Sequence, residues 1–161
     1  LWKYDEAEDF EAMQKILNIL KQRDLLHDFN FSGLHMPRMN LTHANLKRSS
    51  FYLSNLKNCN LTSANMSHIV VGYSNFYYAT LKDTNLRGAD MRYASLGNAD
   101  LTGANLTGAD LTGAMLLATK LDNTQFYGTN LSGAQVGYTL EHALFNNDTI
   151  MPDGSKCHKR W

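Results

Sequence analysis

One apolar residue recurs every five positions from Phe31 to Val136, and this period constrains the fold more than any other feature of the chain. The 22 positions hold leucine 13 times, phenylalanine four times, methionine three times and valine twice. The residue two places earlier is alanine, serine, threonine or cysteine at 18 of the 22, and the residue just before is asparagine or aspartate at 13. A fixed short period held over this length predicts a repeat architecture.

A period of five fits neither the 3.6 residues of a helical turn nor the two-residue alternation of a strand. Each unit must therefore place one large and one small side chain inward and then turn. Asparagine and aspartate suit such turns because they bond to nearby backbone, and glycine suits them because it has no Cβ to clash. Four units close a square coil, so residue i lies over residue i+20. Coils stacked about 4.8 Å apart would pair backbone to backbone, which predicts an all-β solenoid with inner ladders such as Leu41, Leu61, Leu81, Leu101 and Leu121.

Units such as Ala99-Asp100-Leu101-Thr102-Gly103 resemble the pentapeptide-repeat family, whose repeat is A(D/N)LXX. The resemblance covers about two thirds of the chain and implies a right-handed quadrilateral β-helix. Relatives of this kind include DNA-mimicking inhibitors of type II topoisomerases, bacterial effectors, and cyanobacterial and chloroplast proteins without a known activity. The resemblance therefore implies a fold and a bacterial or plastid-type family, while the function has to be argued from the surface.

The segment before the repeat has the pattern of one helix over residues 5 to 27. Asp5 can cap it, and Glu8 three residues later completes a capping box. The first coil of a solenoid exposes an apolar interior and unpaired backbone. The apolar arc of the helix is expected to cover that end, although a partner-binding amphipathic helix is the alternative. The arc consists of Phe10, Met13, Ile16, Leu17 and Leu20.

The sequence thus divides into a helical cap over residues 1–28, a β-helix of about 22 repeats in five to six coils over residues 29–140, and a closing segment with a tail over residues 141–161. Within the repeat, Val70 replaces the turn-forming asparagine, which predicts a local irregularity. Leu140, Leu144 and Phe145 are expected to cover the second open end. Some members of the resembled family dimerise through their C-terminal coil, so the resemblance also implies a possible homodimer at this end.

Charge and composition exclude several classes of function. The chain carries 15 basic and 15 acidic residues, and residues 29–140 hold eight Lys or Arg against five Asp or Glu, a net of +3. Apolar stretches are always interrupted at the turn, so no membrane-spanning segment is expected. Six histidines and two cysteines have no metal-ligand spacing, and no phosphate loop or nucleophile motif is present. No cofactor, metal, small-molecule substrate or enzymatic activity is expected. The cytoplasm is the default location, which a targeting segment removed upstream of Leu1 would change.

The exposed positions of the repeat carry the candidate site. Tyr73 and Tyr93 are one full coil apart and should stack on one face above Leu53, while Tyr52 and Arg92 share the adjacent column. An exposed group of Tyr and Arg is typical of protein interfaces, although aromatic residues stacked across coils also stabilise a sheet. The sequence predicts a candidate interaction face of Tyr52, Tyr73, Tyr77, Tyr78, Arg92 and Tyr93.

The predicted function is therefore a non-catalytic scaffold that binds another protein through a flat solenoid face. The alternative is a DNA mimic that inhibits a type II topoisomerase, but a mimic needs a strongly acidic rod and the net charge of +3 disfavours it. Weak binding of nucleic acid is a further alternative. It is disfavoured because affinity grows with each phosphate that is neutralised, and three positive charges are few.

Overall fold

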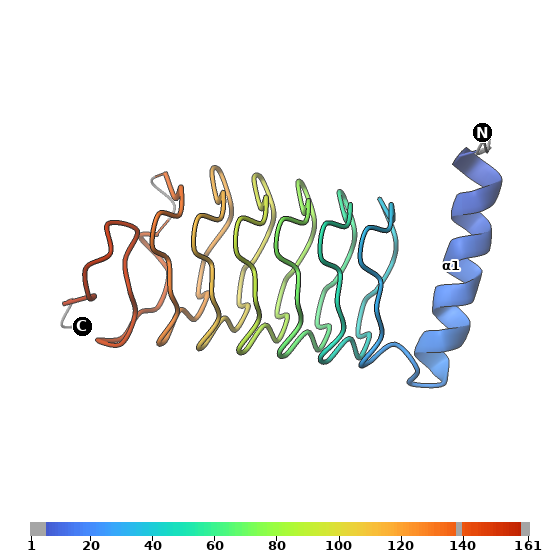
Figure 1. Cartoon of the computed structure of the whole chain (residues 1–161), viewed down its shortest axis with the longest axis horizontal. Coiled ribbons are helices and arrows are strands. Elements are labelled where there is room, and N and C mark those ends of the chain that lie inside the picture. Colours follow the sequence, from blue (N-terminus) through green and yellow to red (C-terminus); the bar gives the residue numbers. More distant parts are fainter. Residues whose placement is uncertain (1–5, 138–139, 159–161) are drawn as a thin grey trace.

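The computed structural model describes residues 6–137 and 140–158 of the chain. Square coils stack into a rod, with the helix α1 (Glu6–Gln22) standing across one end and residues 140–158 at the other (Figure 1). The architecture is a right-handed quadrilateral β-helix with an N-terminal helical cap, which confirms the square solenoid predicted from the five-residue period and the fold that the family resemblance implied.

Neighbouring coils pair through single parallel β-bridges between residue i and residue i+20, because each side of the square is too short for a longer strand. The bridges run without a slip from Asn30–Ser50 to Met115–Gln135. Val70 bridges the coils on both sides of it, so the irregularity expected at this residue is absent. The bridging position is extended and its side chain points outward, and a β-branched residue fits such a position well.

The periodic residues form one continuous core, and the small residues two places earlier complete it. Buried hydroxyl groups need hydrogen-bond partners, and the serine or threonine hydroxyl at each described small inward position donates to a carbonyl of the previous coil. Ser54 Oγ donates to Phe31 O at 2.8 Å, and Thr84 Oγ1 donates to Leu61 O at 2.9 Å. These bonds explain why serine and threonine can replace alanine at the small inward position without leaving an unpaired polar atom.

The corners show why asparagine and aspartate precede the apolar residue so often. Asn75 Oδ1 accepts the backbone N–H of Tyr77 at 2.9 Å, and Asn105 Oδ1 accepts that of Thr107 at 3.0 Å. The second corner residue then has a positive φ, for example 72° at Gly103. Glycine and asparagine tolerate this left-handed conformation best.

Helix α1 ends at Gln22, well before the predicted end at His27. The backbone N–H of Leu25 bonds to Leu20 O at 2.9 Å, that of Asp24 bonds to Lys21 O at 3.1 Å, and Asp24 has a φ of 52°. This is a Schellman motif, in which a left-handed residue stops the helix. The prediction was wrong because the usual signal for such a stop is glycine, whereas here it is an aspartate. The predicted cap residue, Asp5, lies outside the described residues.

The helix packs on the first coil with only part of its predicted apolar arc. Leu17 is buried, and Met13 and Leu20 are partly buried against the core. Phe10 and Ile16 stay 36% and 53% exposed. Of the expected cap contacts Phe10, Met13, Leu17 and Leu20, the last three pack against the core and Phe10 stays exposed.

Polar contacts fix the side of the coil on which the helix lies. Gln14 exchanges two hydrogen bonds with the backbone of Asn40, at 2.7 and 3.0 Å, and Lys21 Nζ donates to Thr42 O at 3.0 Å. On the other side of the same end, Phe29 and Leu34 remain 49% and 38% exposed. The helix therefore covers one side of the open end more fully than the other.

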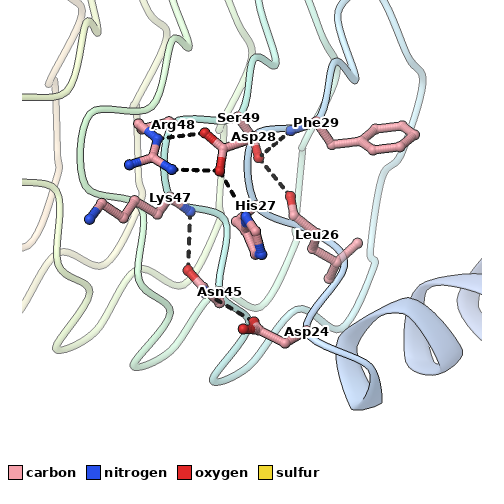
Figure 2. Close-up of polar contacts among 9 residues, drawn as sticks. All are labelled: Asp24, Leu26, His27, Asp28, Phe29, Asn45, Lys47, Arg48 and Ser49. Carbon is pink, nitrogen blue, oxygen red and sulfur yellow. Dashed lines mark hydrogen bonds and ion pairs between the residues drawn. The ribbon is translucent and has the colours of Figure 1, made fainter.

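The segment that leaves the helix is held against the second coil by side chains (Figure 2). Asn45 Nδ2 donates to Asp24 Oδ1 at 3.0 Å, and Arg48 Nη2 donates to Asp28 Oδ2 at 2.7 Å. Buried Ser49 donates through Oγ to Leu26 O at 2.6 Å. Hydrogen bonds from Arg48, supported by His27, hold the pKa of Asp28 well below its usual value.

Coil pairing continues past the boundary expected at residue 140. Phe126 N bonds to Leu144 O at 2.7 Å and Leu131 N bonds to Ile150 O at 2.9 Å. The Gln125–Leu144 bridge joins residues one position closer in sequence than the regular bridges do, and the spacing returns to 20 at the Asn130–Ile150 bridge, so the register shifts locally by one residue and then recovers. Phe145 is buried and stacks on Phe126 at 5.5 Å between ring centroids. Leu144 was expected to cover the open end, but its side chain is 40% exposed because it occupies the outward bridging position.

Candidate protein-interaction surface

Each coil has four sides, and one of them carries the exposed large apolar side chains of the middle of the rod. We call it the tyrosine face, defined as residues 52–58, 72–78, 92–98 and 112–118, which are the four successive segments that form this side and the two corners beside it. Among the described residues 40–137, every exposed large apolar side chain lies on this face, with exposed fractions from 40% to 59%. They are Tyr52, Leu53, Tyr73, Tyr78, Tyr93, Met115 and Leu117.

Aromatic rings connect successive coils along this face. Tyr73 and Tyr93 stack with 4.9 Å between ring centroids, and Tyr52 meets Tyr73 edge-on at 5.8 Å. On the other corner, Tyr77 meets Tyr78 edge-on at 4.5 Å. The six residues predicted as the site therefore lie on the two corners of one side, and contacts join the tyrosines within each corner.

Several of these rings also lie over a glycine of the next coil. A Cβ added to Gly97 would come within 2.8 Å of the Tyr77 ring, and one added to Gly113 would come within 2.5 Å of the Tyr93 ring. The rings thus cover backbone that glycine leaves bare, and such stacking supports neighbouring strands. Part of the aromatic surface is therefore structural, as the alternative interpretation of the sequence expected.

Stacking does not account for the backbone conformation at this face. Leu53, Tyr73, Tyr78 and Tyr93 have φ values of 58°, 57°, 59° and 57°. A bulky residue with positive φ is an outlier that costs on the order of 1–2 kcal/mol. The equivalent position elsewhere in the chain often holds glycine or asparagine. Other corners have the same conformation with a non-glycine residue, for example a φ of 56° at His43 and His68, so positive φ is a property of the corner. What distinguishes this face is that the corner residues are large, apolar and exposed.

The tyrosine face is also uneven in charge. Residues 52–58, 72–78, 92–98 and 112–118 contain no aspartate or glutamate, but they contain Lys57 and Arg92. Arg92 pairs with Asp90 at the border, with Nη2 2.7 Å from Oδ2, and this hydrogen-bonded pair lowers the pKa of Asp90. Lys57 Nζ lies 5.9 Å from the centroid of the Tyr77 ring. This separation is within the range of a cation–π interaction.

A shallow hollow of about 220 Å³ lies between the stacked rings and this ion pair. Its lining combines apolar ring faces with a guanidinium group and a carboxylate, so it suits an amphipathic side chain of a partner. The residues that line it are Tyr52, Gly72, Tyr73, Asp90, Arg92 and Tyr93.

Sequence reasoning missed Met115 and Leu117, which are 40% and 50% exposed on the fourth segment of the face. Both occupy outward positions of the repeat, where the neighbouring units carry polar residues or glycine. Sorting the outward positions into columns, one residue from each coil, would have found them, because Leu117 falls in the column of Lys57 and Tyr77. The predicted face rested on tyrosine and arginine, and the aliphatic residues were overlooked.

The part of the chain that the structure describes offers few candidates for a metal site, a membrane-spanning helix or a reactive thiol. Within residues 6–137 and 140–158, no group of three His, Cys, Asp or Glu side chains is placed to hold a metal ion. The described part of the chain also contains no helix with the length and apolar character needed to cross a bilayer. Cys59 is buried and its Sγ contacts Met36 O at 2.9 Å. Burial raises its pKa to about 12, so the thiol stays protonated.

The square coil, the five-residue period and the inward ladders define a pentapeptide β-helix. The family model for pentapeptide repeats, with eight copies, matches overlapping segments from residue 26 to residue 133. The chain therefore belongs to the pentapeptide-repeat family, as its sequence resemblance implied. Proteins of this family are generally structural scaffolds without catalysis. Comparison with curated protein sequences gave no match.

Solved structures similar to this chain include several pentapeptide repeat proteins. HetL from Nostoc sp. strain PCC 7120, a pentapeptide repeat protein involved in regulating heterocyst differentiation, is 21% identical with a TM-score of 0.39 over 82% of this chain and 89% of that one. QnrB1, a plasmid-mediated fluoroquinolone resistance protein, is 17% identical with a TM-score of 0.48 over 74% and 66%. Rfr23 from Cyanothece 51142 is 25% identical with a TM-score of 0.34 over 86% and 99%.

Proposed function

We propose that this protein is a non-catalytic scaffold that binds another protein through the tyrosine face. The observation that carries the proposal is the gathering of large exposed side chains, among them Leu53, Tyr73, Tyr78 and Tyr93, on one side of the rod. These side chains lie outside the core, and each occupies a positive-φ corner at which glycine or asparagine would turn with less strain. Tyrosine combines a large rigid contact area with a polar hydroxyl, which is why it is enriched at the centres of interfaces.

The rigidity of the solenoid supports the same proposal. Backbone groups on the face are already paired between coils, for example Phe76 N with Ser95 O at 2.7 Å and Leu96 N with Met115 O at 2.8 Å. A surface fixed in this way loses little conformational entropy when a partner binds. The free energy of the contacts is then available for affinity.

The test compares capture of partners by three forms of the protein from lysate of the source organism. The face variant carries Leu53→Asn, Tyr73→Asn and Tyr93→Asn, which remove the apolar side chains and keep a residue suited to positive φ. The control variant carries His43→Asn, Ser63→Asn and His68→Asn, at the same corner position and also at positive φ, but away from the tyrosine face. Quantitative mass spectrometry of the captured proteins is the readout.

We expect wild type and control to retain the same partner and the face variant to lose it by about tenfold or more, the effect of removing one hot-spot residue. Melting curves of all three forms check that folding is matched. Relief of strain at Leu53, which is 59% exposed, should leave the face variant folded. Equal capture by all three forms would refute the proposal and leave the tyrosines with a structural role.

The charge of the rod supports protein binding over the two nucleic-acid alternatives. A DNA mimic needs a dense array of carboxylates, whereas the tyrosine face has none. Direct binding of nucleic acid needs many cations to neutralise phosphates. Here Arg92 is already paired with Asp90, and Lys57 is the cation that remains on the four segments of the face.

Self-association at the C-terminal end is a second, independent proposal. An open depression of about 670 Å³ at this end has a largely apolar lining that includes Leu140, Phe145 and Met151. Leu140 and Met151 are only partly buried here, and an accessible apolar depression of this kind is typical of a contact between subunits. Light scattering after size exclusion should give the mass of a dimer for the wild type and of a monomer for Met151→Lys. A monomeric wild type at high concentration would exclude this contact.

A further inference from the structure

We infer that the partner segment seated on the tyrosine face is an amphipathic α-helix whose apolar stripe is flanked by aspartate or glutamate. The inference rests on the proposed function and goes one step further, because it names the chemistry and the shape of the occupant. Three observations carry it: the saturated backbone of the face, its one-sided charge and the spacing of its side chains.

The saturated backbone excludes a partner that binds by adding a strand. Along the middle of the face, Asn75 N bonds to Ser54 O at 2.9 Å and Ser95 N bonds to Ser74 O at 2.9 Å. The amides of the next residues bond in the same way to the following coil, as Phe76 N does to Ser95 O. Strand addition needs a row of unpaired N–H and C=O groups, and the sides of this rod offer none among these residues. A partner must therefore bind through side chains.

The charge of the face selects an acidic partner. Arg38, on the same corner column as Tyr78 and one coil before Lys57, extends the cationic border, and the segment 32–38 also lacks acidic residues. Both cations are exposed. Both cations lie on one corner of the face, so carboxylates along one flank of an apolar stripe would meet them, whereas a basic flank there would be repelled; the other flank would face the Arg92–Asp90 pair. Complementarity of this kind determines specificity and association rate more than raw affinity.

The spacing of the side chains matches a helix that lies along the rod. Each coil contributes one row of side chains to the face. Successive rows are separated by the distance between coils, as the 4.9 Å between the centroids of the Tyr73 and Tyr93 rings shows. Successive turns of an α-helix repeat at about 5.4 Å. The four segments of the face, from that of Tyr52 to that of Leu117, are separated by three coil-to-coil spacings, which total about 14 Å at the usual strand spacing. A helix of about ten residues covers that length.

The experiment uses the full chain and synthetic peptides of about 14 residues held helical by a side-chain lactam. The first probe has leucine at positions i, i+3, i+4 and i+7 with glutamate on both flanks. The second has lysine in place of glutamate, and the third has the composition of the first with the leucines scattered. A fluorescent oligothymidylate of matched charge is the fourth. Dissociation constants are measured by fluorescence anisotropy at low and at physiological salt.

We expect the glutamate-flanked probe to bind at least about tenfold more tightly than the lysine-flanked and scattered probes, since like charges repel and a scattered stripe cannot fill the rows. The double variant Arg38→Asn, Lys57→Gln should weaken that binding about threefold or more, the range of exposed charge pairs. The control Lys47→Gln, Arg87→Gln removes two cations from another corner and should leave it unchanged.

Equal binding of the acidic and basic probes, tighter binding of the oligothymidylate, or no binding of any probe would overturn the inference. Its failure is distinguishable from failure of the proposed function. If the face variant loses a captured protein while the helical probes do not bind, the face is an interface for a partner of another shape. If neither capture nor probe binding depends on the face, both proposals are refuted.

Discussion

At the scale of single residues, the repeat separates positions that build the rod from positions that are free to carry function. Leu101 is fully buried in an inner ladder, whereas Leu117 is 50% exposed on the tyrosine face. Both are leucines in the same part of the chain, and only their place in the period differs. Whether a leucine is buried or exposed therefore depends on its position in the unit of five and not on its identity.

This contrast gives a matched pair of substitutions. Leu101→Lys should lower the free energy of unfolding by about 4 kcal/mol or more, because it buries an unpaired charge where no carboxylate can reach it. Leu117→Lys should change it by no more than about 0.5 kcal/mol, the range for exposed positions. Urea unfolding followed by circular dichroism measures both. Similar losses for the two variants would contradict the assignment of inward and outward positions.

At the scale of elements, the repeat was predictable and its two ends were less so. The period determined the coil and its ladders because every unit obeys the same packing rule. The end of α1 at Gln22 and the register change near Leu144 depend on single local events, namely the left-handed Asp24 and a local shift of one residue in the bridge spacing. The candidate face was found through its tyrosines and Arg92, and Met115 and Leu117 were missed because aliphatic residues at outward positions were not compared between coils, although the period places them on the same side.

The junction of the helix and the solenoid should respond to acid through Asp28. Arg48 lowers the pKa of Asp28 in the folded protein below the unfolded value of 3.8. The contribution of this pair is therefore fully present at neutral pH, and it is lost as the pH falls below about 4 toward the folded pKa. Methyl resonances of Leu26 should report loosening of the junction in that range.

Asp28 has a φ of 56°, and Asp28→Asn keeps a residue that tolerates this conformation while removing the charge. We expect the Leu26 resonances of this variant to be shifted already at neutral pH and to lose their transition below about pH 4. Asp90→Asn, which removes a carboxylate on another coil whose pKa is also lowered, is the control and should keep the transition. An unchanged transition in Asp28→Asn would show that another group controls the junction.

At the scale of the whole molecule, the rod is a one-dimensional stack in which each coil contacts only its neighbours. Stability in such a stack is the sum of local terms and interfaces, so the ends open first. Hydrogen exchange should therefore be slowest for inward amides of the middle coils, such as Leu81 and Leu86. It should be at least about tenfold faster for Phe31 and Leu131 near the ends. Equal protection along the whole rod would show that it opens only as one cooperative unit.

Four units make one coil, so the position of a residue within each 20 residues fixes the side of the rod on which it lies. This restricts how the length of the sequence can change. Loss of one unit of five between residues 79 and 111 would keep every ladder filled. The same loss would rotate everything after it by a quarter turn, so Met115 and Leu117 would leave the side that carries Tyr73. Loss of four consecutive units would only shorten the rod and leave the faces in phase. Insertions and deletions that preserve the recognition surface should therefore come in whole coils.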